Sequence, residues 1–339
     1  MDVELTRALQ GRKKQLWQAF LERAGLEPDD RVDSTVLVWE DDEIIATGSR
    51  TGNLLKCIAV DDLHQGEGLT GTLLTQLRQD AFKEGHSHLF LYTKPKNKFM
   101  FSSLFFYPIA QTSDVLLMEN KKNGLQEFLA TLSPVPCDGT VGAAVMNCNP
   151  FTKGHRYLIE TAAKACDRLY VFVLSEDRSY FSAEDRMNMV KLGVADLTNV
   201  VVIPGGRYAV SSLTFPSYFT KEENLAKAHT AIDAEIFCRH IAPALGAKHR
   251  FLGTEPLSAV TNVYNETLKE RLPRADIEVT ELTRLEKEEQ PVSASRVRGL
   301  LGESREALVN PSEELVSQLS RLVPATTLDY LLTKVAANA

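Results

Sequence analysis

The spacing of apolar residues along the first third of the chain predicts helices and strands in a mixed order. Between Leu5 and Arg23 apolar residues recur every three or four positions, the period of an amphipathic helix. Short runs rich in β-branched and aromatic residues then predict strands, and an acidic turn at 40–42 joins the first two into a hairpin. The expected elements are a helix over 5–23, strands over 35–39, 43–46 and 54–60, a helix over 68–83, a strand over 89–92, a short helix over 98–105 and a strand over 115–118.

A second pattern begins after Ser133-Pro134-Val135-Pro136, where two prolines interrupt both helix and strand. Beyond it, apolar strand-like runs alternate with helical segments, which is typical of a parallel sheet covered by helices. We therefore expect two domains, over residues 1–132 and 137–339, the second ending in helices from about residue 295. Its expected elements are strands over 141–146, 169–174, 200–203, 250–252 and 277–279, and helices over 155–166, 183–193, 222–240 and 260–271.

Composition and charge exclude some functions. The net charge of -7 argues against nucleic acid as the main partner, because a nucleic-acid binder normally shows a basic face. The five cysteines are scattered and contain no Cys-x-x-Cys pair, which predicts free thiols in a reducing compartment and no metal held by the protein. The sequence begins without an apolar signal region and has no run of about 18 apolar residues, so we expect a cytoplasmic protein without a membrane partner.

A glycine-rich turn, Gln65-Gly66-Glu67-Gly68, follows a predicted strand and opens a helix. Gly66, Gly68 and Gly71 fit the dinucleotide fingerprint Gly-x-Gly-x-x-Gly. That fingerprint needs an acidic residue about 20 positions later, where this chain has none. A cradle for another pyrophosphate group is the remaining functional reading, since N–H groups at a helix start bind phosphate. The alternative is a turn with no ligand.

The strand at 141–146 leads through Asn149-Pro150-Phe151 into a helix that opens with Thr152-Lys153-Gly154-His155. Gly154 lets an anion approach the backbone, and the helix start offers N–H groups and partial positive charge. Thr152, Lys153 and His155 add a hydroxyl, a charge and a ring N–H donor. Phosphoryl-type transfer needs this charge stabilisation and alignment rather than a covalent nucleophile. We therefore expect Asn149 to His155 to handle phosphate, although a lone histidine at such a position would be a capping or surface residue.

Thr-x-Gly-His at a first strand–helix junction resembles the first motif of the nucleotidyltransferase superfamily, whose second motif is Ile-Ser-Ser-Thr-x-x-Arg. The corresponding segment here is Val292-Ser293-Ala294-Ser295-Arg296-Val297-Arg298. Ser293, Ser295 and Arg298 keep the polar groups of that motif, and Ala294 lacks one. The resemblance implies that Ser293, Ser295 and the helix that Ser295 opens grip the β- and γ-phosphates, with Arg298 as a charged clamp.

Two further candidates follow other strands. Arg186, in the segment 181–186, could reach the site, and the alternative is a capping segment with a solvated arginine. Gly253-Thr254-Glu255-Pro256 follows the strand at 250–252, at the edge where open α/β sheets bind ligands. With the segment 261–265, it is a candidate for the adenine and ribose side of a nucleotide pocket.

The order of elements in the first domain and its Gln-x-x-Gly turn resemble the GNAT acetyltransferase domain, where this turn holds the pyrophosphate of coenzyme A. Thr70 departs from the glycine or alanine usual in that family. A GNAT-like α+β domain followed by a Rossmann-like nucleotidyltransferase domain, with a parallel sheet and C-terminal helices, resembles the citrate lyase ligase family over essentially the whole chain. Segments 149–159 and 256–265 resemble that family in detail.

The resemblance implies an ATP-dependent ligase that acetylates the prosthetic-group thiol of the citrate lyase acyl carrier subunit from acetate, releasing AMP and pyrophosphate. His155, Thr152 and Lys153 would then stabilise charge on the α-phosphate, and Mg²⁺ would accompany the triphosphate. Asn149, Phe151, Gly154, Gly253 and Arg186 would complete the nucleotide site, and Gln65, Gly66 and Gly68 would hold the pantetheine-type arm of the carrier. Two other classes stay open: a nucleotidyltransferase that makes a dinucleotide cofactor, and an acetyltransferase or regulatory module whose second domain senses nucleotide.

Overall fold

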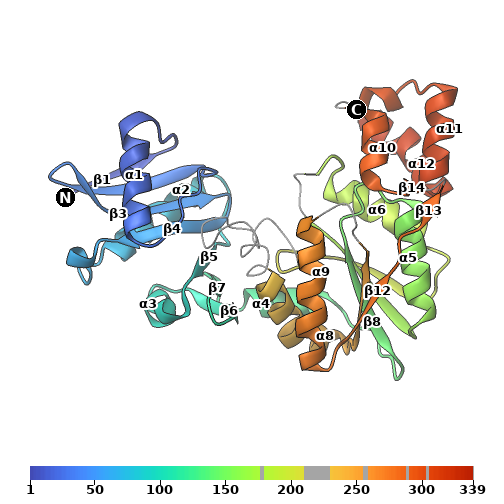
Figure 1. The fold of residues 1–339 in the computed structure, drawn as a ribbon, viewed down its shortest axis with the longest axis horizontal. Coiled ribbons are helices and arrows are strands. Elements are labelled where there is room, and N and C mark those ends of the chain that lie inside the picture. The colour runs from blue at the N-terminus through green and yellow to red at the C-terminus, as the bar shows by residue number, and fades with distance from the viewer. Residues whose placement is uncertain (176–178, 210–229, 255–258, 288–289, 303–304, 339) are drawn as a thin grey trace. The chain divides into compact units, whose positions relative to one another are not determined.

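The computed structural model describes residues 1–175, 179–209, 230–254, 259–287, 290–302 and 305–338. The chain divides into two compact units, Met1–Glu127 with Ser212–Ile236, and Phe128–Ser211 with Phe237–Ala339 (Figure 1). The predicted helix over 222–240 falls partly outside the described residues, and its described part is helical from residue 230. Within the described ranges, no helix is both long enough and apolar enough to cross a membrane.

The first unit is built on a seven-stranded sheet with the order β1-β2-β3-β4-β5-β7-β6. Neighbouring strands are antiparallel except for β4 and β5, which are parallel. Its elements are β1 (Asp2–Thr6), α1 (Gly11–Arg23), β2 (Ser34–Glu40), β3 (Glu43–Thr51), β4 (Leu54–Val60), η1 (Asp62–His64), α2 (Leu69–Lys83), β5 (Phe90–Thr93), η2 (Pro95–Asn97), α3 (Lys98–Ser103), β6 (Tyr107–Gln111) and β7 (Leu116–Glu119). Helix α4 (Gly124–Thr131) follows across the boundary between the units.

Helices α1 and α2 cover opposite faces of this sheet. Trp17 of α1 is fully buried and its indole Nε1 donates to Thr47 Oγ1 at 3.1 Å. A Cβ atom at the next residue, Gly48, would lie 3.1 Å from Leu77 Cδ1 of α2. Because successive strand residues point to opposite faces, Thr47 marks the α1 side and Gly48 the α2 side. The first unit therefore has the expected α+β layering.

Two strands of the first unit differ from the prediction. Leu5 was expected in a helix, but it lies in β1 and pairs with Val36 of β2, because Asp2 to Thr6 alternate polar and apolar residues. Strand β6 was not expected because it contains Pro108. It lies at the edge of the sheet, where a residue without an N–H group is tolerated.

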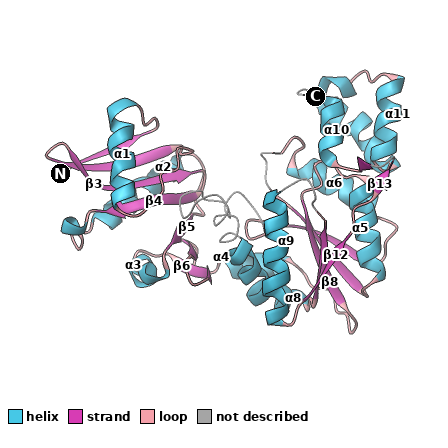
Figure 2. Ribbon diagram, viewed as in Figure 1, coloured by secondary structure: helices cyan, strands magenta, loops and turns pink. Residues whose placement is uncertain are grey.

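The second unit contains a five-stranded parallel sheet with the order β10-β9-β8-β11-β12. Its strands and α-helices are β8 (Val141–Met146), α5 (Lys153–Lys164), β9 (Arg168–Val173), α6 (Ala183–Gly193), β10 (Val200–Pro204), α8 (Ala242–Leu245), β11 (His249–Gly253), α9 (Ala259–Arg271), β12 (Glu278–Leu282), β13 (Glu286–Lys287), β14 (Gln290–Pro291), α10 (Ala294–Leu301), α11 (Glu313–Leu322) and α12 (Ala325–Tyr330). Short 3-10 and π turns complete it: η4 (Phe237–Ile241), η5 (Leu272–Ala275), η6 (Arg305–Leu308), η7 (Leu331–Val335) and η8 (Ala336–Asn338). The predicted parallel sheet with C-terminal helices is confirmed (Figure 2).

The strand order of this sheet fixes where a ligand site is expected. The chain runs outward from β8 to β9 and β10, and then returns to the other side of β8 to form β11 and β12. Ligands of open α/β sheets bind outside the carboxyl ends of the strands at such a reversal. Ile159 of α5, Val190 of α6, Val297 of α10 and Leu319 of α11 belong to one buried apolar cluster with strand residues, so this edge is framed by packed helices.

Candidate active site

The first predicted motif lies at the reversal point, between β8 and α5. Thr152 caps the N-terminus of α5 and is buried. Its hydroxyl accepts from the backbone N–H of His155 at 3.4 Å, and its own N–H donates to His155 Nδ1 at 3.0 Å. This reciprocal pair is a capping box in which a histidine takes the usual place of glutamate or glutamine. The start of α5 is therefore fixed by the same two residues that the motif singled out.

The capping box also fixes which ring nitrogen of His155 carries a proton. A backbone N–H can only donate, so Nδ1, which receives the N–H of Thr152, must be the unprotonated acceptor. The proton of the neutral ring is then on Nε2, which is a donor. Burial, and after it the charge of Arg284, lower the pKa of His155 to about 4. At neutral pH His155 is thus an uncharged hydrogen-bond donor rather than an imidazolium.

The second motif is in direct contact with the first. A Cβ atom on Gly154 would lie 2.8 Å from the carbonyl oxygen of Val292, which is closer than real Cβ atoms approach. Arg298 donates from one guanidinium nitrogen to the carbonyl of Asn149 and from the other to Ser295 Oγ at 3.0 Å. The structure therefore brings both motifs together. The contact also explains why glycine is needed at position 154, because the backbone of the second motif occupies the space that a side chain would fill. The sequence alone did not suggest this explanation.

One detail of the second motif differs from the prediction. Helix α10 begins at Ala294, and its N-cap is Ser293, whose hydroxyl accepts from the N–H of Arg296 at 3.3 Å. Ser295 was expected to open the helix, but it lies in the first turn and accepts from Arg298 instead. The first N–H groups of α10 and of α5 both lack intrahelical acceptors, as at every helix start, so two partial positive charges belong to this site.

Three of the predicted polar residues form side-chain hydrogen bonds with backbone groups around the site. Arg186 is fully buried and donates to the carbonyls of Asn147 at 3.1 Å and Leu174 at 2.8 Å. The alternative of a solvated arginine is therefore wrong, and contact of Arg186 with a ligand stays a prediction. The amide oxygen of Asn149 accepts from the N–H of Phe181 at 3.0 Å. Lys153 Nζ donates to the carbonyl of Ser320, in the last turn of α11, at 2.7 Å.

Phe151 and Cys148 are packing residues beside the motif. Phe151 is fully buried, its ring stacks on His155 with centroids 5.9 Å apart, and a Cβ atom on Gly193 would lie 2.3 Å from it. Phe151 thus holds the ring of His155 in place. Cys148 is fully buried, and burial raises the pKa of its thiol. A buried protonated thiol is a poor nucleophile, so the chemistry of this edge does not pass through Cys148.

The far side of the site is formed by the ends of β11 and β12. A Cβ atom on Gly253 would lie 2.9 Å from Leu158 Cδ1 of α5, so β11 ends against the motif helix. Asn265, predicted on the ligand side, is buried and donates to the Gly253 carbonyl at 2.9 Å. Glu255 and Pro256, also predicted there, lie outside the described residues. The Thr254 carbonyl accepts from Arg284 Nε at 2.7 Å, and Thr254 Oγ1 accepts from the Arg284 N–H at 3.1 Å.

Arg284 is a site residue that the sequence analysis missed. It follows β12 by two positions, it is half-buried, and its charge lowers the pKa of His155. Leu285, the next residue, accepts from the N–H of Val292, which is the residue that packs on Gly154. The expected strand ended at residue 279, five positions before Arg284. If the expected strand had been extended to Leu282, Arg284 would have followed its carboxyl end directly. An arginine at that position of a parallel strand indicates a ligand-binding residue.

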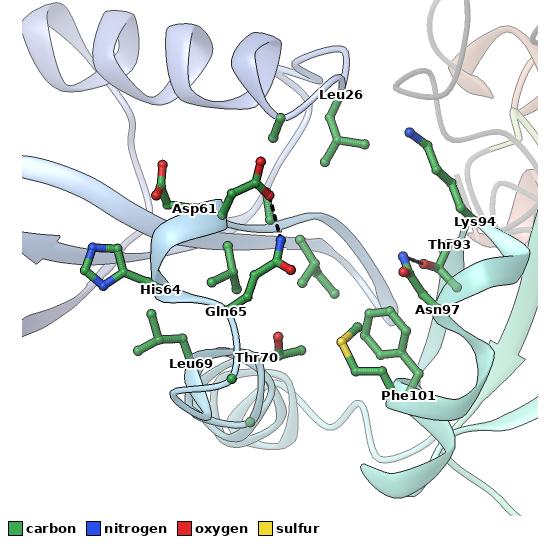
Figure 3. A pocket seen from close by; sticks show the side chains of 18 of the residues that line it. Leu26, Asp61, His64, Gln65, Leu69, Thr70, Thr93, Lys94, Asn97 and Phe101 are labelled. Atoms are coloured by element: carbon green, nitrogen blue, oxygen red, sulfur yellow. Dashed lines mark hydrogen bonds between the residues drawn. The ribbon is translucent and has the colours of Figure 1, made fainter.

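The first unit contains a pocket of about 890 Å³ around the predicted glycine turn (Figure 3). Strands β4 and β5 pair only through Leu54↔Phe90 and Leu55↔Leu91, so their later residues diverge and border the pocket. Gly66 and Gly68 have φ of 92° and 79°, which only glycine adopts readily. Gln65 also lines the pocket, and its amide donates to Asp62 at 2.7 Å. All three turn residues singled out from the sequence thus line one cavity.

The fold and the two helix starts at this edge of the sheet define the class of the protein: a two-part α/β chain whose second unit has nucleotidyltransferase-like features. Within the described residues, no group of three or more His, Cys, Asp and Glu side chains could hold a metal ion. A family model for the citrate lyase ligase C-terminal domain matches residues 141–331. The chain belongs to the citrate lyase ligase family.

Individual relatives agree with the family match. The chain is 41% identical over 320 residues to a citrate (pro-3S)-lyase ligase of Klebsiella pneumoniae, covering 92% of this chain and 91% of that protein. It is 40% identical over 320 residues to the protein of that name from Escherichia coli K12, covering 92% and 88%. Among solved structures, an acetyltransferase of the GNAT family from Staphylococcus aureus Mu50 is similar over 35% of this chain and 100% of that chain, with 14% identity and a TM-score of 0.29.

Proposed function

We propose that the protein activates acetate with ATP and transfers the acetyl group to the prosthetic-group thiol of the citrate lyase acyl carrier subunit, which activates citrate lyase. Family membership supports the ligase class and citrate lyase as the target. The observation that carries the nucleotide half of the proposal is the contact between the two motifs. It places the starts of α5 and α10, the donor His155 and Arg284 at the same edge of one parallel sheet.

In the first step an oxygen of acetate attacks the α-phosphorus of ATP, and the bond from that phosphorus to the bridging oxygen of pyrophosphate breaks. The products are acetyl-adenylate and pyrophosphate. Negative charge grows on the transferring phosphate and on the leaving pyrophosphate. Neutral His155 stabilises it by donating from Nε2, and the helix N-termini and Arg284 add positive potential. Mg²⁺ would accompany the triphosphate, bound chiefly through phosphate oxygens.

In the second step the carrier thiol attacks the carbonyl carbon of acetyl-adenylate. A thioester forms, AMP leaves, and the thiol proton passes to solvent. The thiol terminates an arm that resembles coenzyme A, and the 890 Å³ pocket of the first unit supports a role for that unit in holding it. Such an arm is an extended chain with amide groups, and the pocket offers both apolar side chains and polar ones such as Gln65 and Asn97.

Three assays test the reaction and separate it from the alternatives. Acetate-dependent exchange between pyrophosphate and ATP reports the first step. Formation of AMP together with recovered activity of deacetylated citrate lyase reports the second. A dinucleotide product formed without acetate would favour a cofactor-synthesising nucleotidyltransferase, and absence of AMP with any acceptor would favour a nucleotide sensor. Either outcome would replace the proposal.

The role of the first unit is tested by a pair of substitutions on α2. Thr70 lines the pocket, so Thr70→Trp fills it with a bulky side chain. Thr75, on the same helix, is exposed and lies outside the pocket lining, so Thr75→Trp is the matched control. We expect Thr70→Trp to slow carrier acetylation by about tenfold or more, because ligands fill such pockets closely. The exchange reaction should keep its wild-type rate. Equal carrier acetylation by both variants would contradict the role of this pocket.

A further inference from the structure

Beside the pocket of the first unit, the surface of η2 and α3 is both basic and apolar. Lys94, Lys96 and Lys98 are exposed there. Phe99 and Phe105 have 85% and 66% of their surface in solvent. With Met100, which is 41% exposed, these residues form what we call the basic aromatic surface.

The three lysines have no acidic neighbour in the sequence, although Asp61 and Asp62 line the pocket that Lys94 and Lys96 border. The chain carries a net charge of -7, yet residues 85–113 contain no aspartate or glutamate. Among the residues that the structure describes, Lys94, Lys96 and Lys98 form no ion pair. By contrast, Lys13 and Lys14 of the same unit pair with Glu4 at 2.5 Å and Asp30 at 2.7 Å. Like charges that lie close together outside ion pairs raise the local potential and attract an acidic partner.

The exposed aromatic rings are not needed to hold α3 in place. Phe101 is the buried residue of this short helix, and its ring packs edge-on against Phe106 with centroids 6.4 Å apart. That contact attaches α3 to the core, whereas Phe99 and Phe105 remain in water. Exposed aromatic residues grouped among positive charges are typical of a binding surface, where they become buried when a partner docks.

The basic aromatic surface continues into the pocket. Lys94, Lys96 and Met100 belong to both. Asn97 and Phe101 of the same segment also line the pocket, and Figure 3 shows them with Lys94. A partner docked on η2 and α3 therefore sits where an arm that it carries can enter the pocket directly.

We propose that the basic aromatic surface docks an acidic carrier protein domain, and that the thiol arm of this domain enters the adjacent pocket. The inference rests on the proposed function, in which such a carrier is the acetyl acceptor. Rim charges steer a partner to the surface, and the two phenylalanines supply the apolar contact area. A small molecule with the same arm uses the pocket without the contact to Phe99 and Phe105.

Two variants test the docking surface, K94E/K96E/K98E and F99A/F105A. With the full-length protein we expect the Kd for the deacetylated carrier subunit, measured by calorimetry, and the KM for it to rise at least about tenfold. Acetate-dependent exchange should stay unchanged in both variants. Acetylation of free pantetheine should stay unchanged in F99A/F105A, because Phe99 and Phe105 lie outside the pocket lining. Raising the salt concentration should weaken wild-type binding of the carrier more than binding by the lysine variant. The controls are K83E/K121E/K122E and F82A, which change exposed residues of the same unit outside the basic aromatic surface.

Unchanged carrier affinity in both variants would overturn the proposal. An equal loss with pantetheine in F99A/F105A would also overturn it, because such a loss would indicate damage to the pocket. A dimer that dissociates in the variants without a change in carrier affinity would assign the surface to a second copy of the chain. Binding of the wild type to anionic vesicles, lost in the variants while carrier affinity is kept, would assign it to a membrane. If wild-type protein shows no acetate-dependent exchange, the proposed function fails, and carrier affinity still decides on docking.

Discussion

Gly154→Ala tests whether the two motifs must touch for the site to work. Gly154 is the second residue of α5, and an added Cβ atom would lie 2.8 Å from the carbonyl oxygen of Val292. Ordinary contacts begin at 3.4 Å, so α5 and the strand before α10 must move apart by about 0.6 Å. The obstacle is backbone, which cannot rotate away as a side chain could. Ser293, the cap of α10, would move together with Val292.

The magnitudes can be worked out for stability and for activity. Overpacking of this kind costs about 1–3 kcal/mol. Replacing glycine by alanine in a helix returns up to about 1 kcal/mol. We therefore expect the free energy of unfolding to fall by roughly 0–3 kcal/mol, which leaves the protein folded. A misplacement of about 1 Å at a reacting centre costs on the order of 10²-fold in rate, so a shift of about 0.6 Å should slow exchange between pyrophosphate and ATP by roughly tenfold.

Gly299→Ala is the matched control for Gly154→Ala. Gly299 lies inside α10, and a Cβ atom there would meet nothing within 4 Å. This substitution should raise the free energy of unfolding by about 0.5–1 kcal/mol and leave exchange unchanged. Urea unfolding and exchange kinetics measured on both variants separate the helix-propensity effect from the contact with Val292. If Gly154→Ala is as stable and as active as Gly299→Ala, the contact between the motifs does not limit the site, and our reasoning about it is wrong.

Two further predictions concern His155 and the arginine beside it. His155→Gln should lower adenylylation by about 10²–10³-fold if the ring stabilises charge in the transition state, and a minor change would refute that role. Because the pKa of His155 falls from 6.5 to about 4 on folding, its contribution to stability is complete above pH 6.5 and is lost as the pH falls toward 4. Urea unfolding between pH 7 and 4 should therefore show a steeper loss for wild type than for His155→Gln, and identical slopes would contradict the burial of a neutral ring. Arg284→Gln should raise the pKa of His155, measured by NMR titration of labelled histidine, and slow exchange by about tenfold, because it removes a positive charge from the site. Arg274→Gln, at an exposed arginine that pairs with Glu270, is its control, and an unchanged His155 pKa in Arg284→Gln would exclude the coupling.

Much of the fold could be predicted because its elements have strong local signals. The parallel sheet of the second unit follows from apolar runs between helical segments, and the starts of α5 and α10 follow from Thr152 and Ser293. Strand β6 was missed because Pro108 is a strand breaker everywhere except at an edge. Whether a strand lies at an edge depends on the order of the whole sheet, and local sequence does not contain that order.

The sequence predicted which residue types lie at the candidate site, but it predicted only part of what each side chain contacts. A sequence shows that Lys153, Arg186 and Arg298 are cationic, but each of the three donates to a backbone carbonyl of the protein itself. Whether a cationic side chain bonds to the protein backbone or stays available for a ligand depends on which carbonyls lie near it after folding. Arg284 was missed for the same reason, since its closeness to His155 depends on β12 lying next to β11.

This division of roles has a chemical consequence for a site that is proposed to bind a triphosphate. Cations that already bind carbonyls are held rigidly, so they position the helix starts instead of moving toward each new ligand. The donor that the capping box holds most tightly, His155, is neutral, so it can strengthen its hydrogen bond as charge develops without first binding the ground-state anion as an ion pair. In the proposed reaction, positive potential from the two helix starts and from Arg284, which is likewise held by the Thr254 carbonyl, binds the nucleotide. His155 then favours the transition state over the bound nucleotide. Under this proposal binding and catalysis belong to different groups, so His155→Gln should lower the rate of the chemical step far more than it raises the KM for ATP.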